Sequence, residues 1–283
     1  MIWRADKDGK IVILNYDDYG AIMTRELQQF EKLDVSADGS DTYLEKVRID
    51  CNELVVELHA IGELKDELLL PITGMKCRNN AHRKVNGASA KYFRCNTPTY
   101  AYPLFKTHKL TPANLLNVAI KEIPVRLLQS AGNISTSRIT AFLEFILKPI
   151  SAEFCKNCPN EFCQDSRHYI GDLLMWKERL TKKIETAKQK PVFYIVAADV
   201  KALYPSLHRD TVTKALECAF EKHSDYSAEA RKIIVELNKI CLNNVVTQYG
   251  DQLYIQKNGI ITTKSHWPTL LCITSYSRFA DMR

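Results

Sequence analysis

Residues 191–212 of this chain read PVFYIVAADVKALYPSLHRDTV. The first half is a short apolar run rich in β-branched and aromatic residues, which predicts a buried strand. Asp199 ends this strand, and a turn at Tyr204 and Pro205 separates it from a helical pattern that begins near His208. A carboxylate at the mouth of a buried strand is costly unless a cation pairs with it, and a divalent metal ion that carries phosphates is the natural partner. The stretch therefore predicts a metal site at Asp199.

The segment DVKALYPSL, residues 199–207, resembles motif A of the reverse transcriptases of Penelope-like retroelements. In that family a metal-binding aspartate is followed five residues later by an aromatic residue that discriminates deoxyribose from ribose in the incoming nucleotide. The resemblance implies that Asp199 and the backbone carbonyl of Val200 hold magnesium, or manganese in its place. It also implies that Tyr204 excludes the ribose 2′-hydroxyl of the incoming nucleotide.

Composition places the chain among globular proteins. A hydrophobic content of 46% in 283 residues is enough for a core, in one large domain or two ordinary ones. The 39 basic and 33 acidic residues give a net charge of +6, which permits a polyanionic partner without requiring one. The sequence shows no transmembrane run and no secretory signal, and it has nine cysteines, an odd number. These features predict reduced thiols in an intracellular protein of the nucleus or cytoplasm.

The N-terminal segment is a second match to the same family. Residues 3–14 read as a charged turn next to the strand IVIL, which is typical of an exposed hairpin. Ala5, Asp6 and Lys7 match the start of the family's polymerase region, which implies that Lys7 lies in the fingers near the incoming nucleotide. Without the resemblance, Lys7 is an ordinary solvated lysine.

Two helices are predicted after this segment. Asp17 or Asp18 is the expected N-terminal cap of a helix through residues 21–33, and a second helix is expected from about Asp41 towards Leu64. The basic residues 73–96 that follow contain two aromatic side chains, which suits either phosphate and base binding or a solvated loop.

The segment YPLFKTHK is a third match, with the family's tyrosine, leucine, lysine, histidine and lysine falling on Tyr102, Leu104, Lys106, His108 and Lys109. On a short extended segment these side chains would alternate between two faces and grip the backbone of a template and primer. The alternative is a surface strand with exposed lysines.

Residues 124–150 predict a strand with one arginine, a turn of small residues, and an apolar helix that is capped by Ser135 or Thr136 and ended by Pro149. The resemblance implies that Arg126 contacts the triphosphate of the incoming nucleotide. The planar guanidinium of arginine matches a phosphate better than an ammonium does.

A cysteine- and histidine-rich segment follows, with the spacing C-x2-C-x4-C-x4-H at Cys155, Cys158, Cys163 and His168. Three thiolates and one imidazole are able to close a tetrahedral zinc site. The alternative, which we favour over zinc, is a set of structural cysteines before a capped helix at residues 169–188.

Residues 245–259 predict a hairpin with Gly250 and Asp251 at its turn, leading into a segment that resembles motif B of the family. Gln256 and Gly259 match that motif, which implies that they support the nucleotide. Trp267, where the family has serine, departs from it and would obstruct the nucleotide pocket.

Two-metal phosphoryl transfer needs carboxylates from two chain segments. Asp199 is one, and the family supplies the other from a YxDD hairpin after motif B. Asp281 resembles that hairpin only faintly, because Met282 replaces the second aspartate. We therefore expect a chain truncated before the catalytic hairpin and the thumb.

The resemblance as a whole implies an α+β fold, the fingers and first part of the palm of a right-hand polymerase, with an antiparallel palm sheet. The expected division is an N-terminal region at 1–95, a fingers region at 96–190 and the start of the palm at 191–283. The implied function is RNA-directed DNA synthesis, with an RNA template, a DNA primer and deoxynucleoside triphosphates as partners. Two alternatives stay open: an inactive retroelement remnant that binds nucleic acid, and an intracellular interaction domain.

Overall fold

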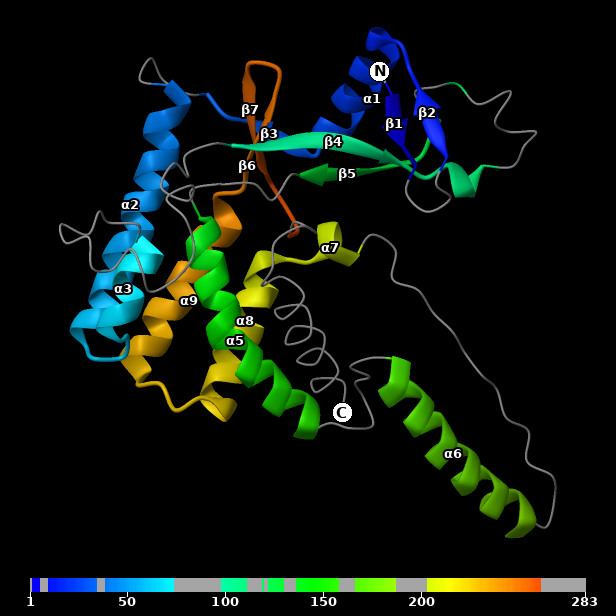
Figure 1. Ribbon diagram of the computed structural model, residues 1–283, viewed down its shortest axis with the longest axis vertical. Coiled ribbons are helices and arrows are strands. Elements are labelled where there is room, and N and C mark those ends of the chain that lie inside the picture. The colour runs from blue at the N-terminus through cyan, green and yellow to red at the C-terminus, as the bar shows by residue number, and fades with distance from the viewer. Residues whose placement is uncertain are drawn as a thin grey trace.

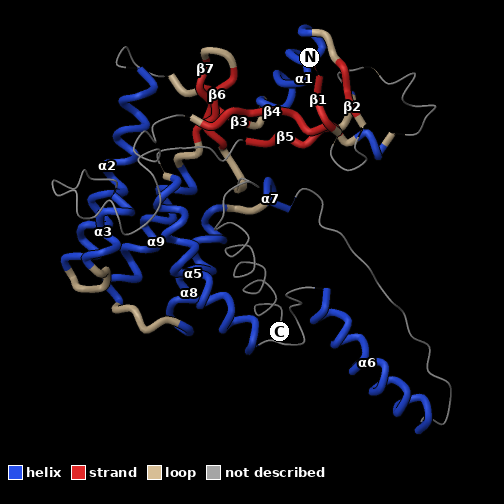
Figure 2. The backbone as a smooth tube through the Cα atoms, in the orientation of Figure 1, coloured by secondary structure: helices blue, strands red, loops and turns tan. Residues whose placement is uncertain are grey.

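The computed structural model describes residues 2–5, 10–34, 39–73, 98–110, 119, 122–129, 136–157, 166–186 and 203–260. In these ranges a five-stranded sheet lies at one end of the molecule and a layer of helices at the other (Figure 1, Figure 2). A separate two-stranded hairpin pairs β1 (Ile2–Arg4) with β2 (Ile11–Ile13), as expected for the N-terminal segment. The α+β class predicted from the sequence is confirmed.

The five-stranded sheet has the strand order β3-β7-β6-β4-β5. It is mixed rather than wholly antiparallel, because β4 and β6 pair in parallel while every other neighbouring pair is antiparallel. Its members are β3 (Phe30–Lys32), β4 (Thr99–Phe105), β5 (Val125–Gln129), β6 (Val246–Tyr249) and β7 (Gln252–Gln256). The sheet therefore takes strands from all three expected sequence regions.

The hairpin predicted at residues 245–259 is confirmed as β6 and β7. Gly250 lies at its turn with a φ angle of 60°, a left-handed conformation that glycine adopts at low cost. Val246 and Leu253 are buried on one face of the hairpin, where they pack against Leu44 of α2 (Gly39–Ala60). This contact links the sheet to the helical layer.

Helix α1 (Tyr16–Leu27) covers the other face of the sheet. Tyr19, Met23 and Leu27 pack against Ala101 of β4, and Leu127 of β5 joins the same cluster. The prediction that Asp17 or Asp18 caps this helix was wrong, because the helix begins earlier in the sequence. The cap is Asn15, whose Oδ1 accepts a hydrogen bond from the Asp18 N–H at 2.7 Å. The two aspartates lie instead in the first turn, where the helix dipole favours negative charge.

The predicted extension of this helix to Leu33 was also wrong. The helix ends at Leu27, and residues 30–32 form β3 instead. The partner of β3 is β7, with Phe30 opposite Gln256 and Lys32 opposite Tyr254. Because this partner lies more than 200 residues away in sequence, local periodicity does not reveal the strand.

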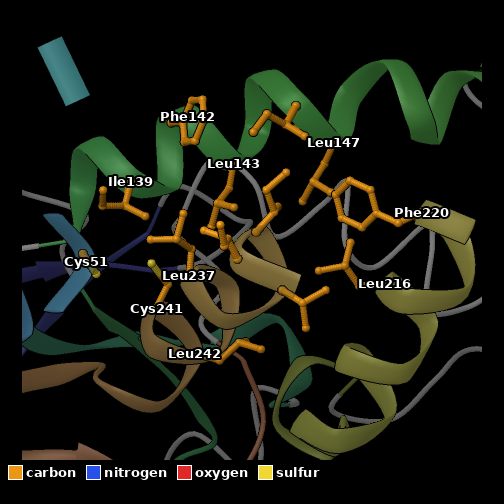
Figure 3. Close-up of a cluster of buried hydrophobic side chains, with 14 of the residues drawn as sticks. Cys51, Ile139, Phe142, Leu143, Leu147, Leu216, Phe220, Leu237, Cys241 and Leu242 are labelled. Atoms are coloured by element: carbon orange, nitrogen blue, oxygen red, sulfur yellow. The ribbon is translucent and has the colours of Figure 1, made fainter. Parts of the chain in front are cut away.

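The helical layer surrounds the largest hydrophobic core of the described residues (Figure 3). Leu143, Leu216, Phe220, Leu237 and Cys241 are fully buried in it. The core joins α2 to four other helices, α3 (Asp66–Thr73), α5 (Ser137–Asn157), α8 (Arg209–His223) and α9 (Ala228–Asn243). The helix predicted to begin near His208 is confirmed as α8. Ser227 caps α9, where its Oγ accepts a hydrogen bond from the Ala230 N–H.

Helix α5 does not end at Pro149, contrary to the prediction. Proline removes one helical hydrogen bond and crowds the preceding turn, at a cost of about 3 kcal/mol in a helix interior. The helix continues because Leu147 and Ile150, on either side of Pro149, are both buried in the core. Tertiary packing therefore outweighs the local preference.

Helix α6 (Ser166–Thr186) agrees with the helix predicted at 169–188, and it stands apart from the helical layer (Figure 1). Its apolar side chains Ile170, Leu174 and Trp176 are exposed. Within the described ranges, no helix has both the length and the apolar character that crossing a membrane requires.

Candidate nucleotide and nucleic-acid site

Tyr204 and Gly259, which the sequence analysis assigned to two different motifs, lie close together in the structure. Tyr204 belongs to the short helix α7 (Leu203–Ser206), and its ring packs against the main core. Its backbone carbonyl accepts a hydrogen bond from the N–H of Ile260 at 3.0 Å. Ile260 is itself buried in the same core. This backbone bond joins the motif A-like turn to the segment that follows β7.

Residues 256–259, here called the β7 turn, have a conformation that depends on glycine. Gly259 has a φ angle of 76°, in the left-handed region that other residues adopt only with strain. The Gln256 side chain donates from Nε2 to the Asn258 carbonyl at 2.7 Å, and its backbone N–H donates to the Val245 carbonyl at 3.3 Å. Gln256 thus orders the β7 turn internally.

Arg209, the first residue of α8, holds the β7 turn from outside. Its Nε donates to the Gly259 carbonyl at 3.3 Å, and its Nη2 donates to the Gln256 carbonyl. Its Nη1 donates to Oδ1 of Asn243, near the end of α9, at 3.2 Å. Burial lowers the pKa of Arg209, but guanidinium groups stay protonated in proteins.

Sequence reasoning missed Arg209, although one signal was present. The start of a helix favours acidic residues, because the unsatisfied backbone N–H groups there carry partial positive charge. An arginine at the first position of a helix therefore interacts unfavourably with the helix dipole. Such a residue points to acceptors elsewhere in the fold, which here are the carbonyls of the β7 turn.

A second group of predicted residues lies on one face of β4 and β5. Side chains alternate along a strand, and Ala101 and Phe105 of β4 are buried on the side of α1. The other side, here called the β4–β5 face, carries Tyr100, Tyr102 and Leu104 from β4 with Arg126 and Leu128 from β5.

The β4–β5 face is partly open to solvent. The Tyr100 side chain is 57% exposed, and Arg126, which pairs with Leu104 across the strands, is also exposed. Lys106 extends the pairing by one residue, because its N–H donates to the Pro124 carbonyl at 2.9 Å. Tyr100 lies opposite Gln248 of β6, and therefore on the face of the sheet where Val246 packs against α2, whereas α1 covers the other face. Aromatic and cationic side chains therefore share one face.

The expectation that Lys106, His108 and Lys109 stand on an extended segment was wrong. The strand ends at Phe105, and Thr107–Lys109 forms a short 3-10 helix, η3. The Lys109 N–H donates to the Lys106 carbonyl at 3.0 Å, which closes a tight turn, and Thr107 is buried. The three basic residues therefore follow one another around a turn, with His108 and Lys109 exposed.

The N-terminal match adjoins this turn. Ala5 is buried and forms an isolated parallel bridge with Phe105, and its N–H donates to the Lys10 carbonyl at 2.8 Å. The segment that carries Ala5 therefore reaches the end of β4 next to Lys106. Lys7 itself lies outside the described residues.

The predicted metal ligands are only partly covered by the structure. Asp199 and Val200 lie outside the described residues, as do Asp281, Cys158 and Cys163. Cys155 lies in α5 and His168 in α6. In the part of the chain that the structure describes, no group of three or more histidine, cysteine, aspartate or glutamate residues is arranged to hold a metal ion.

Comparisons with protein-family models, with curated proteins and with solved structures found no match to this chain.

Proposed function

We propose that this chain forms the fingers and the first part of the palm of a reverse transcriptase similar to those of Penelope-like retroelements. In this function it binds an RNA template paired with a DNA primer and takes part in magnesium-dependent addition of deoxynucleotides. Asp199 and the Val200 carbonyl would hold the magnesium ion, which neutralises charge at the transferred phosphate when bound. Lys7 and Arg126 bind the triphosphate, and Tyr204 borders the sugar.

The observation that carries this proposal is the hydrogen bond between the Tyr204 carbonyl and the Ile260 N–H. The resemblance assigns Tyr204 to the sugar of the nucleotide, and it assigns Gln256 and Gly259 to the support of the same nucleotide. These residues are about fifty positions apart in sequence, and no local pattern requires them to meet. Their proximity is what the proposed function needs.

The β4–β5 face supports the nucleic-acid part of the proposal. Tyrosine rings stack on bases regardless of sequence, while lysine and arginine attract the phosphates between them. Tyr100 and Tyr102 supply the rings, and Lys106, directly after β4, supplies charge for the nucleic acid, while Arg126 is assigned to the triphosphate. This face lies on the side of the sheet on which α2 packs.

The proposal is tested by primer extension on an RNA template with magnesium and deoxynucleotides. Two-metal transfer needs a second carboxylate besides Asp199, so we expect the wild-type chain by itself to bind the duplex without extending the primer. Any extension that it does show should be lost in Asp199→Ala and kept in Asp225→Ala, a matched change at an exposed aspartate between α8 and α9. Extension that survives Asp199→Ala would contradict the assignment of the magnesium site. Absence of both binding and extension would contradict both the proposed function and the inactive remnant, and leave the interaction domain.

A further inference from the structure

Arg209 links three segments that are distant in sequence, namely the start of α8, the β7 turn and the end of α9. Its guanidinium donates to the carbonyls of Gln256 and Gly259 in the β7 turn and to the Asn243 side chain near the end of α9. The residue itself begins α8. Three acceptors around one planar group require a guanidinium, because an ammonium on a flexible stem acts as a single point charge and does not match this arrangement.

A single peptide group, between Gly259 and Ile260, connects Arg209 to Tyr204. The Gly259 carbonyl accepts from Nε of Arg209 at 3.3 Å, and the next atom along the backbone is the nitrogen of Ile260. The Ile260 N–H donates to the Tyr204 carbonyl at 3.0 Å. A peptide group is planar and resists twisting, so its carbonyl and N–H point in fixed, opposite directions. Fixing the oxygen of this group therefore fixes the direction of its N–H.

We propose that Arg209 is a positioning residue for Tyr204, acting through the peptide group between Gly259 and Ile260. Arg209 sets the orientation of this peptide group, and the peptide group sets the backbone of α7. The position of the Tyr204 ring follows from its backbone and from its packing against the core. The positioning itself does not depend on the proposed function, whereas its consequence for sugar selection does.

The first test measures the hydrogen exchange of the Ile260 amide and the environment of the Tyr204 ring. In Arg209→Lys and Arg209→Ala, we expect the Ile260 amide to exchange its hydrogen about tenfold faster than in the wild type, the factor that corresponds to losing about 1.4 kcal/mol. The reference is the Leu237 amide in the centre of α9, whose exchange should not change. We also expect the fluorine NMR signal of 3-fluorotyrosine placed at position 204 to shift in the same variants.

Asn243→Ala is the matched control, because it removes one acceptor of Arg209 and keeps both bonds to the β7 turn. We expect Ile260 exchange and the Tyr204 signal to stay at wild-type values in this variant. Ethylguanidinium added to Arg209→Ala should restore the protection of Ile260, which a general loss of stability would not show. Unchanged Ile260 exchange in Arg209→Lys would overturn the proposal.

A second test connects the positioning to the proposed function. In magnesium-dependent nucleotide binding, we expect Arg209→Lys to reduce the preference for deoxynucleotides over ribonucleotides in the same direction as Tyr204→Ala. If the wild type binds no nucleotide, the proposed function fails, and the exchange and fluorine measurements still decide the positioning by Arg209. A preference that Tyr204→Ala reduces and Arg209→Lys leaves unchanged would contradict positioning.

Discussion

Single residues account for the local geometry of the candidate site. Gly259 was predicted to belong to it from the resemblance alone, and its left-handed φ angle gives a physical reason for glycine at that position. Arg209 was not predicted, because its three acceptors come from residues that sequence does not place near it. A left-handed backbone conformation favours glycine at a defined position, whereas an arginine at the start of a helix indicates acceptors elsewhere without indicating which residues supply them.

The buried tyrosine of α1 gives a prediction about alkaline pH. Burial against the sheet, with smaller effects of Tyr249 and Tyr16, raises the pKa of Tyr19 from 10.0 to about 12. Because the folded pKa lies above the unfolded one, this contribution to stability is complete below about pH 10 and is lost as the pH rises towards about 12. We expect Tyr19→Phe to lose less of its unfolding free energy over this range than the wild type.

Urea unfolding at a series of pH values between about 8 and 12 measures this difference. Tyr43 and Tyr226 also have pKa values raised by burial, so part of the loss should remain in the variant. An identical pH dependence in Tyr19→Phe and wild type would show that Tyr19 is not buried in solution.

Whole elements were predictable where the pattern is local. The hairpin of β6 and β7 was predicted from alternating side chains and the Gly250 turn, and α8 from the helical pattern that begins near His208. The elements that were missed depend on distant partners. The strand β3 exists because it pairs with β7, and the 3-10 turn after Phe105 contains Thr107, which is buried against other parts of the fold.

Helix α5 gives a prediction at this scale. Pro149 is exposed within the helix, and its ring lacks the N–H that would donate to the carbonyl of Phe145. We expect Pro149→Ala to raise the unfolding free energy by about 2 kcal/mol, since the helix gains this bond and loses a steric clash. The measurement is urea unfolding, with Lys148→Ala at the neighbouring exposed position as the control. No gain over that control would mean that α5 is interrupted at Pro149, as the sequence alone suggested.

The molecule as a whole combines segments that the sequence analysis treated separately. Strands from the three expected regions form one sheet, and the parallel pair of β4 and β6 joins residues almost 150 positions apart. The α+β class was predictable from the types of element, while the mixed strand order was not, because pairing across such distances depends on tertiary packing. Two of the candidate groupings, Tyr204 with the β7 turn and Lys106 with Arg126, exist only through this arrangement.

The most direct test of the proposed function is the salt dependence of binding to an RNA template annealed to a DNA primer, measured by fluorescence anisotropy. Each phosphate contact releases counterions, so the logarithm of affinity falls linearly with the logarithm of salt concentration. We predict that Lys106→Ala with Lys109→Ala reduces this slope by about 2, roughly 1 for each cation removed. The matched double variant Lys214→Ala with Lys232→Ala, at exposed positions of α8 and α9, should keep the wild-type slope. A wild-type chain that does not bind the duplex, or a slope that the two double variants share, would contradict the assignment of the basic residues after β4 to nucleic acid.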